Sequence, residues 1–301
     1  MNYKLSFILH PSSLIPNPSS KMIVISRSDL ERSIPVATSK DDNIFDLLSP
    51  AIAAEAECVS NSILGSVGLD AYDDAANVAL VAITKKVVCL RAFTRQFRQL
   101  DLVLTATGFG VVSTQDLAPA SKMRTDALIS QLHVDLMRSE AVLIKMLFAI
   151  PTWWNTPQRV GCVPNLFWNI DLLERYGGRE TVTINDWRLA QPVILAADNF
   201  LRSRLSAALM DELLAVHAGK PTDSDRRPII EVIVIPAIQK YIGLCVAADH
   251  PAAREQYHQL MNSIEAHLDL FPEYANSDAY RANHYEGFQN TADSTAFFFQ
   301  G

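Results

Sequence analysis

The chain has 301 residues and a formal net charge of −7, with 49% hydrophobic and 20% charged residues. That apolar fraction can offset the conformational entropy lost on folding, so it excludes an intrinsically disordered protein. With 11 Gly and 15 Pro, the chain is neither collagen-like nor of low complexity. The acidic balance argues against a protein whose main task is to neutralise phosphates.

The first 21 residues combine a short apolar run with a stretch rich in Pro and Ser. The apolar run is too short for a secretory signal, and we predict an N-terminal arm over residues 1–40. No run of about 18 apolar residues is present, so we expect no membrane-spanning segment. The cysteines are widely spaced without a Cys-x-x-Cys pair, which indicates reduced thiols. They are Cys58, Cys89, Cys162 and Cys245.

Apolar residues recur at helical spacing through much of residues 41–150, which predicts a first helical domain. We expect helices over 44–64, 74–100 and 121–150. Between them, residues 102–113 form two short β-branched runs about a Gly-containing turn, which predicts a small β-hairpin. The expected buried side of the first helix includes Ile44, Phe45, Leu47, Leu48, Ile52, Cys58, Val59, Ile63 and Leu64.

Pro151 and Pro157 flank a pair of tryptophans, and no helical period crosses this segment. We therefore place a domain boundary there, followed by a second helical domain over residues 151–275. Its helices are expected near 166–176, from 186, from 225 and over 251–270.

The two predicted domains resemble each other in sequence. Residues 43–54 align without gaps on residues 185–196, and both segments carry a proline, Pro50 or Pro192. Residues 86–90 fall near 240–244 when a loop gap is allowed. A chance match of two amphipathic helices stays open, but the shared proline favours a duplication. The predicted fold is therefore all-α, with two tandem helical bundles, a hairpin insertion and an extended C-terminal arm.

Arg91, Arg95 and Arg98 form a basic stripe on the helix predicted over 74–100. The alternatives are a solvated face, a DNA-facing stripe, or a contact with acidic residues of the next copy. We favour the contact between copies, which closes into a ring if its rotation allows. The candidate acidic partners are Glu55, Glu57, Asp70, Asp73 and Asp74.

The segment 276–301 is rich in aromatic residues without a helical period, and includes Phe297, Phe298 and Phe299. It either folds back over its own helices or extends as an arm that anchors aromatic side chains in a partner.

No catalytic signature is present. Glu255-x-x-His258 has the spacing of a di-metal site, but that chemistry needs a second such pair, which the sequence lacks. The other histidines are scattered, and neither a nucleophile elbow nor a Walker sequence occurs. We therefore predict no catalytic residue, no metal and no cofactor.

Five segments together carry a family resemblance: Ile-Phe-Asp-Leu-Leu-Ser-Pro-Ala-Ile at 44–52, Ile-Leu-Gly at 63–65, the hairpin at 104–113, Ala-Pro-Ala-Ser-Lys-Met-Arg at 118–124, and Ser-Thr-Ala-Phe-Phe-Phe-Gln-Gly at 294–301. This combination resembles the head-tail adaptors of tailed phages and prophages of gut anaerobes, also called head completion or neck ring proteins. The likeness is best over residues 22–150, with the final octapeptide as a second anchor.

The resemblance implies a structural virion protein of the neck, assembled in the host cytoplasm. It would form a ring under the portal, matching the portal symmetry, and join the DNA-filled head to the tail. Its partners would be itself, the portal, and tail or other neck proteins, with transient passage of DNA and no membrane. The hairpin, with Phe109 and Val111, and the C-terminal aromatic residues would dock on neighbours. A helical enzyme and a regulatory nucleic-acid-binding module remain the alternatives.

Overall fold

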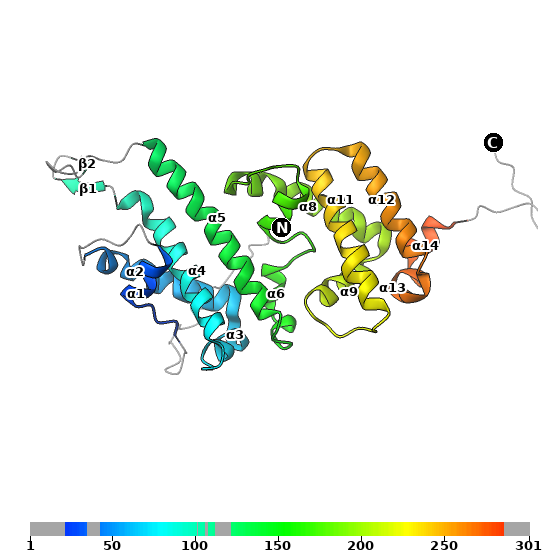
Figure 1. Cartoon of the computed structure of the whole chain (residues 1–301), viewed down its shortest axis with the longest axis horizontal. Helices are drawn as coiled ribbons and strands as arrows, with labels where there is room; N and C mark the ends of the chain where they lie inside the picture. Colours follow the sequence, from blue (N-terminus) through cyan, green and yellow to red (C-terminus); the bar gives the residue numbers. More distant parts are fainter. Residues whose placement is uncertain (1–21, 35–42, 101, 106–107, 112–121, 286–301) are drawn as a thin grey trace, which may run out of the picture.

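The computed structural model describes residues 22–34, 43–100, 102–105, 108–111 and 122–285 (Figure 1). The described part is mostly helical, which confirms the predicted all-α class. The helices form two groups along the long axis of the molecule (Figure 1). We call α1 to α5 with the hairpin the N lobe and α8 to α14 the C lobe, with α6 and α7 between them.

The N lobe is built on two long helices that pack on α4. Its helices are α1 (Arg27–Ser33), α2 (Asn43–Val59), a π-helix (Ser60–Leu64), α3 (Gly65–Tyr72), α4 (Val78–Gln96), a 3₁₀-helix (Phe97–Gln99) and α5 (Lys122–Leu147). Pro50 lies inside α2 without ending it. The predicted 44–64 helix is thus continued by a π-helix, and a positive φ of 63° at Gly65 then changes the chain direction.

Strands β1 (Leu102–Thr105) and β2 (Gly108–Val111) pair antiparallel, with Leu104 opposite Phe109 and Leu102 opposite Val111. Figure 1 places this pair at one end of the long axis, beyond the ends of α4 and α5.

The prediction of an N-terminal arm over residues 1–40 is wrong for residues 22–34, the part that the structure describes. Ser26 and Asp29 form a reciprocal capping box, in which each residue's side chain accepts a hydrogen bond from the other's backbone N–H. This cap starts α1, and Leu30 and Ile34 then pack fully into the core.

The C lobe has α11 at its centre, packed against α8 and α12. The elements after α5 are a 3₁₀-helix (Trp153–Asn155), α6 (Pro157–Cys162), α7 (Ile170–Tyr176), α8 (Ile184–Leu205), α9 (Ala207–His217), α10 (Arg226–Pro228), a π-helix (Ile229–Val234), α11 (Ile235–Val246), α12 (His250–Glu265), a 3₁₀-helix (Leu268–Leu270), α13 (Pro272–Ala275) and α14 (Asp278–Asn283).

The helical run over residues 226–246 is long and apolar enough to cross a membrane, judged by length and composition alone. Its buried residues, including Ile238 and Ile242, pack in the core of the C lobe. A core helix of a folded domain passes the same test, so the run is weak support for a membrane span.

The segment predicted as a domain boundary is packed rather than exposed. Trp153 is completely buried, and its indole N–H donates to the backbone carbonyl of Ile63 at 2.8 Å. Helix α7 adds a second connection, since Glu174 accepts a hydrogen bond from Arg138 of α5 at 2.5 Å. One hydrophobic core therefore runs through both lobes.

The prediction of an extended tail over 276–301 places the start of the tail too early, because part of this segment is helical. Ser277 caps α14, and Asn283 at its end donates to the carbonyl of Arg204 and to the hydroxyl of Tyr274. Tyr274 is fully buried and meets Tyr280 edge to face. The aromatic residues here stabilise a short helix. The rest of the predicted arm, residues 286–301, lies outside the described residues.

Candidate interaction surfaces

The arginine stripe, which spans α4 and the 3₁₀-helix after it, is paired within its own chain. Arg91 donates to Glu140 of α5 at 2.6 Å, and Arg95 donates to Glu55 of α2 at 2.7 Å. Arg98 donates to Asp126 of α5 at 3.1 Å. Glu55, a candidate partner on the next copy, therefore has its ion pair in the same chain. The stripe joins α4 to its two neighbours.

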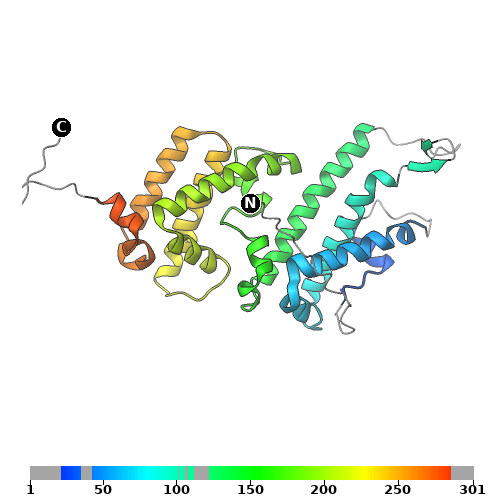
Figure 2. The ribbon, with the colours of Figure 1, turned by 180° about the vertical axis from the view of Figure 1, so that it is seen from behind.

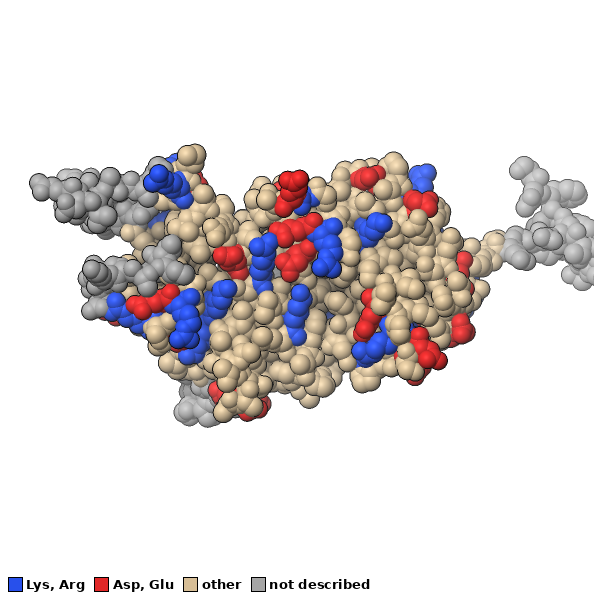
Figure 3. Space-filling view, viewed as in Figure 1, with Lys and Arg blue, Asp and Glu red and all other residues tan. Residues whose placement is uncertain are grey.

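Burial separates the three arginines. The Arg91 side chain is 23% exposed and that of Glu55 only 9%, whereas Arg95 and Arg98 are largely exposed. Burial by itself lowers the pKa of Arg91, but the charge and hydrogen bond of Glu140 raise the pKa above its ordinary value. Exposed pairs such as Arg98 with Asp126 contribute little to stability. The face seen in Figure 3 carries acidic and basic side chains intermixed, without one large basic patch.

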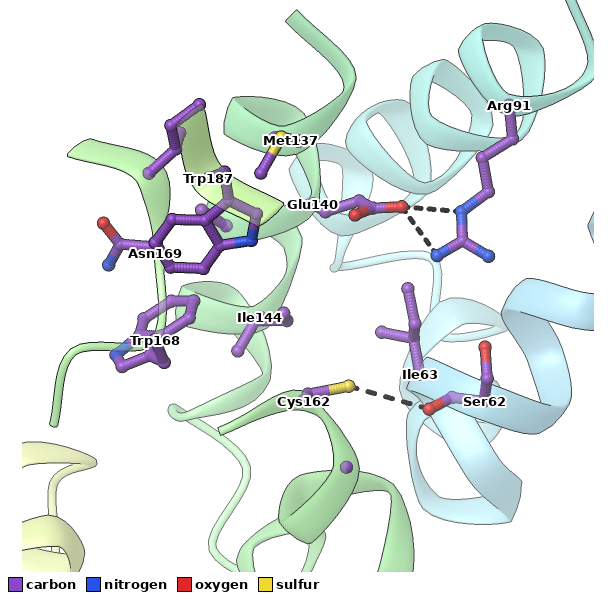
Figure 4. A pocket seen from close by; sticks show the side chains of 13 residues that line it. Ser62, Ile63, Arg91, Met137, Glu140, Ile144, Cys162, Trp168, Asn169 and Trp187 are labelled. Carbon is purple, nitrogen blue, oxygen red and sulfur yellow. Dashed lines mark hydrogen bonds and ion pairs between the residues drawn. The ribbon is translucent and has the colours of Figure 1, made fainter. Parts of the chain in front are cut away.

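We call the segment between α5 and α8 the junction. A cavity of about 360 Å³ lies where the N lobe meets it (Figure 4). The Arg91–Glu140 pair forms one side of it, and Trp168 and Trp187 face it from the other. Cys162 points into it, with its Sγ 3.6 Å from the carbonyl oxygen of Ser62 as a weak donor.

The thiol at this cavity, Cys162, is poorly suited to act as a nucleophile. Burial raises the pKa of the Cys162 thiol to about 11, so the thiol stays protonated at neutral pH and is a weak nucleophile. Among the described residues, no group of three His, Cys, Asp or Glu side chains could hold a metal ion. Glu255 and His258 on α12 are both exposed, and Glu255 accepts a hydrogen bond from Gln259.

The structure places the remaining candidate residues apart from the arginines. Phe109 and Val111 lie in β2, at the end of the molecule opposite α14 (Figure 1). Phe297, Phe298 and Phe299 lie outside the described residues. The structure therefore brings the three arginines together along α4 and the 3₁₀-helix that follows it but does not join them to the hairpin residues.

Two exposed apolar stripes are a feature that the sequence reasoning missed. On α2 the stripe consists of Leu47, Pro50, Ala54 and Cys58, and on α8 of Leu189, Pro192, Val193, Ala196 and Phe200. Leu47 is 68% exposed and Leu189 is 65% exposed. The predictions that Leu47 and Cys58 face the core are therefore wrong. The gap-free alignment of residues 43–54 with 185–196 was the available signal, since it pairs these two leucines.

The comparisons with known proteins add a family without a known role. Residues 46–162, less than half of the chain, match a family of unknown function, DUF6712. The matched region runs from α2 to the end of α6, so it covers most of the N lobe and the junction segment with Trp153. No curated protein and no solved structure matches the chain.

Proposed function

We propose that this chain is a structural assembly protein that acts as a head-tail adaptor of a tailed phage or prophage. In this proposal it forms a ring under the portal and joins the DNA-filled head to the tail or to other neck proteins. The two lobes are duplicated helical bundles, and the hairpin and residues 286–301 dock on neighbours. The sequence resemblance over residues 22–150 is the reason for proposing a phage head-tail adaptor rather than another kind of assembly.

The observation that carries the proposal is the pair of exposed apolar stripes on α2 and α8. Large exposed apolar patches on folded domains mark surfaces that bind other proteins. Leu47 and Leu189 each expose about two thirds of their surface, and each is accompanied along one helix face by further exposed apolar residues. Other chains would cover these side chains in an assembly.

Shape and charge also support the proposal. The hairpin and α14 lie at opposite ends of the long axis (Figure 1), so one copy can contact one neighbour at each end. The net charge of −7 suits a ring that passes DNA, because strong phosphate contacts would retain the DNA.

Catalysis is not part of the proposal. The charged groups that line the cavity are occupied by each other, as in the Arg91–Glu140 pair, and Cys162 is held as a neutral thiol. Activation of a substrate would require one of these groups to be released from its present partner.

The decisive experiment is particle composition together with native mass. Deletion of the gene should give DNA-filled heads without tails, and complementation with the full chain should restore joined particles. The purified chain should form a ring alone or on the portal protein of the same genome, seen by light scattering and negative-stain imaging. A chain absent from particles and indifferent to the portal would contradict the proposal.

A further inference from the structure

The helices α2 and α8 hold equivalent places in their lobes. Each lies across its lobe on the side that faces the viewer in Figure 2. Most aligned residues agree in burial: Leu48 and Ala190 are buried, as are Ile52 and Ile194, although Ala51 is buried and its counterpart Val193 is exposed. The aligned leucines of the two stripes are exposed. The chain therefore presents the same kind of apolar surface twice, on one side of the molecule.

The two stripes differ in the sign of the charges beside them. Exposed carboxylates flank the α2 stripe, Asp46 just before Leu47 and Glu57 just before Cys58. Exposed guanidinium groups flank the α8 stripe, Arg188 just before Leu189 and Arg204 about one helical turn after Phe200. The guanidinium carbon of Arg204 lies 5.6 Å from the centre of the Phe200 ring.

These four charged side chains form no ion pair with another described residue. Many other described carboxylates and guanidinium groups form ion pairs, including the buried Asp198 of α8 with Arg202 at 2.8 Å. No described residue forms an ion pair with Asp46, Glu57, Arg188 or Arg204. The α2 stripe thus has two carboxylates beside it and the α8 stripe two guanidinium groups, none of them neutralised by an ion pair within the described residues. Arg91 of α4 also reaches the α2 stripe, where its Nη1 donates to Cys58 Sγ at 3.5 Å.

We propose that the α2 stripe of one copy packs against the α8 stripe of a second copy of this chain. This inference rests on the proposed self-assembly and names the surfaces that carry it. Unlike charges would meet at both ends of the contact, whether the helices approach parallel or antiparallel. Pairing α2 with α2, or α8 with α8, would bring like charges together, which is unfavourable. Charge thus selects the mixed contact.

The contact has two geometric outcomes. Helices α2 and α8 lie on one side of the molecule (Figure 2), so two copies facing each other can form two such contacts and close a pair. A copy that uses its stripes on different neighbours instead propagates a chain or ring. Native mass distinguishes these outcomes, and both require the same α2–α8 contact.

The test uses two blocked variants of the full chain and one matched control. Leu47→Glu blocks the α2 stripe, and Leu189→Glu blocks the α8 stripe. The control is Val78→Glu, the same kind of change at a side chain that is 72% exposed but outside both stripes. Light scattering and sedimentation give the mass over a range of concentrations, and circular dichroism confirms that each variant melts like the wild type. Leu47→Gln and Leu189→Gln, which add no charge, are the second pair of variants.

The wild type and the control should self-associate equally. Each blocked variant should weaken self-association by at least about tenfold, as expected for a central apolar contact. An equimolar mixture of the two blocked variants should associate again as a pair, since one variant keeps the α8 stripe and the other keeps the α2 stripe. If the two substitutions only lowered the solubility or stability of each variant, mixing the variants would not restore self-association.

Three results would overturn the inference: a wild-type chain that stays monomeric because another segment or protein covers the stripes, blocked variants that associate like the wild type, or a mixture without recovery. The proposed function is judged separately by presence in particles. A monomeric chain found in joined particles would overturn this inference alone. Self-association by a chain absent from particles would overturn the adaptor function alone.

Discussion

The N lobe and the C lobe each pack one central helix against two others, and they differ in the chemistry of these contacts. In the N lobe α4 packs against α2 and α5, and in the C lobe α11 packs against α8 and α12. Ion pairs link the N-lobe helices, since Glu55, Arg91 and Glu140 come from α2, α4 and α5. Aromatic rings link the C-lobe helices. Phe200 of α8, Tyr241 of α11 and Tyr257 of α12 all lie within 5.4 to 6.1 Å of one another, measured between ring centroids.

The turn after α2 and its π-helix can be compared with the turn after α8. Gly65 ends the π-helix with φ 63°, and Ser206 ends α8 with φ 90°. Relative to α8, the N lobe has one extra residue before this turn, and a π-helix is the form in which a helix accommodates one extra residue. Seven residues beyond each turn lies a buried residue, Tyr72 in the N lobe and Leu213 in the C lobe.

The largest effect should come from the aromatic contact. Tyr241→Ala removes a ring that is 8% exposed and should lower the free energy of unfolding by about 3 kcal/mol. Urea unfolding measures this loss, which should change little between low and high salt. Tyr241→Phe keeps the ring and is the control. A strongly salt-dependent loss would contradict an apolar origin.

Removing the ion pairs of Arg91 in the N lobe should lower the free energy of unfolding by less than Tyr241→Ala does. This loss should depend on the salt concentration. Arg91→Leu leaves Glu140 and the nearly buried Glu55 without this guanidinium, so we expect a loss of about 2 kcal/mol in unfolding free energy. Arg98→Leu, which breaks an exposed pair, should cost less than about 0.5 kcal/mol. Hydrogen exchange should show faster opening in α4 than in α11 for Arg91→Leu. Equal costs for the two variants would remove the distinction between buried and exposed pairs.

A smaller loss of unfolding free energy should follow from breaking the hydrogen bond between Trp153 and Ile63, which joins the segment after α5 to the N lobe. Trp153→Phe removes the indole donor and leaves the carbonyl of Ile63 without its partner, a loss of about 1 to 2 kcal/mol. Trp154→Phe changes the neighbouring, partly exposed indole and should cost less. Hydrogen exchange of the π-helix and α6 should rise in the first variant alone. An unchanged exchange pattern would show that the hydrogen bond does not couple the lobes.

The smallest effect concerns pH. Burial lowers the pKa of His217, at the end of α9, below its ordinary value of 6.5. The unfolded chain therefore binds a proton more readily than the folded chain, and stability falls as the pH drops below that value. His217→Gln should flatten this part of the curve of unfolding free energy against pH. A steeper fall in the variant would reverse the expected sign.

Periodicity predicted most helices because apolar spacing records which residues a helix can bury. It could not decide the face of α2, where apolar residues surround most of the helix and Leu47 lies outside the buried arc. The alternation of Pro and Ser before residue 22 hid α1, whose start depends on the local cap between Ser26 and Asp29. Helix α14 has only six residues, too few to show a period, and it is held by contacts with Tyr274.

The interaction surfaces were less predictable for a different reason. The stripe of Arg91, Arg95 and Arg98 was evident, but its partners were not. Glu140 lies 49 residues from Arg91 in sequence, and only the packing of α4 on α5 brings them together. Sequence spacing reports neighbours on one helix and does not report which carboxylate another helix supplies.

The distribution of tryptophan has an optical consequence. All four tryptophans of the chain lie around the junction, Trp153 and Trp154 in the 3₁₀-helix and Trp168 and Trp187 beside the cavity. Intrinsic indole emission therefore reports on the junction, while far-ultraviolet circular dichroism reports on helices throughout the chain. When the chain is unfolded gradually, a shift in emission that precedes the loss of helix would record two folded lobes coming apart. Coincident transitions would record one cooperative unit.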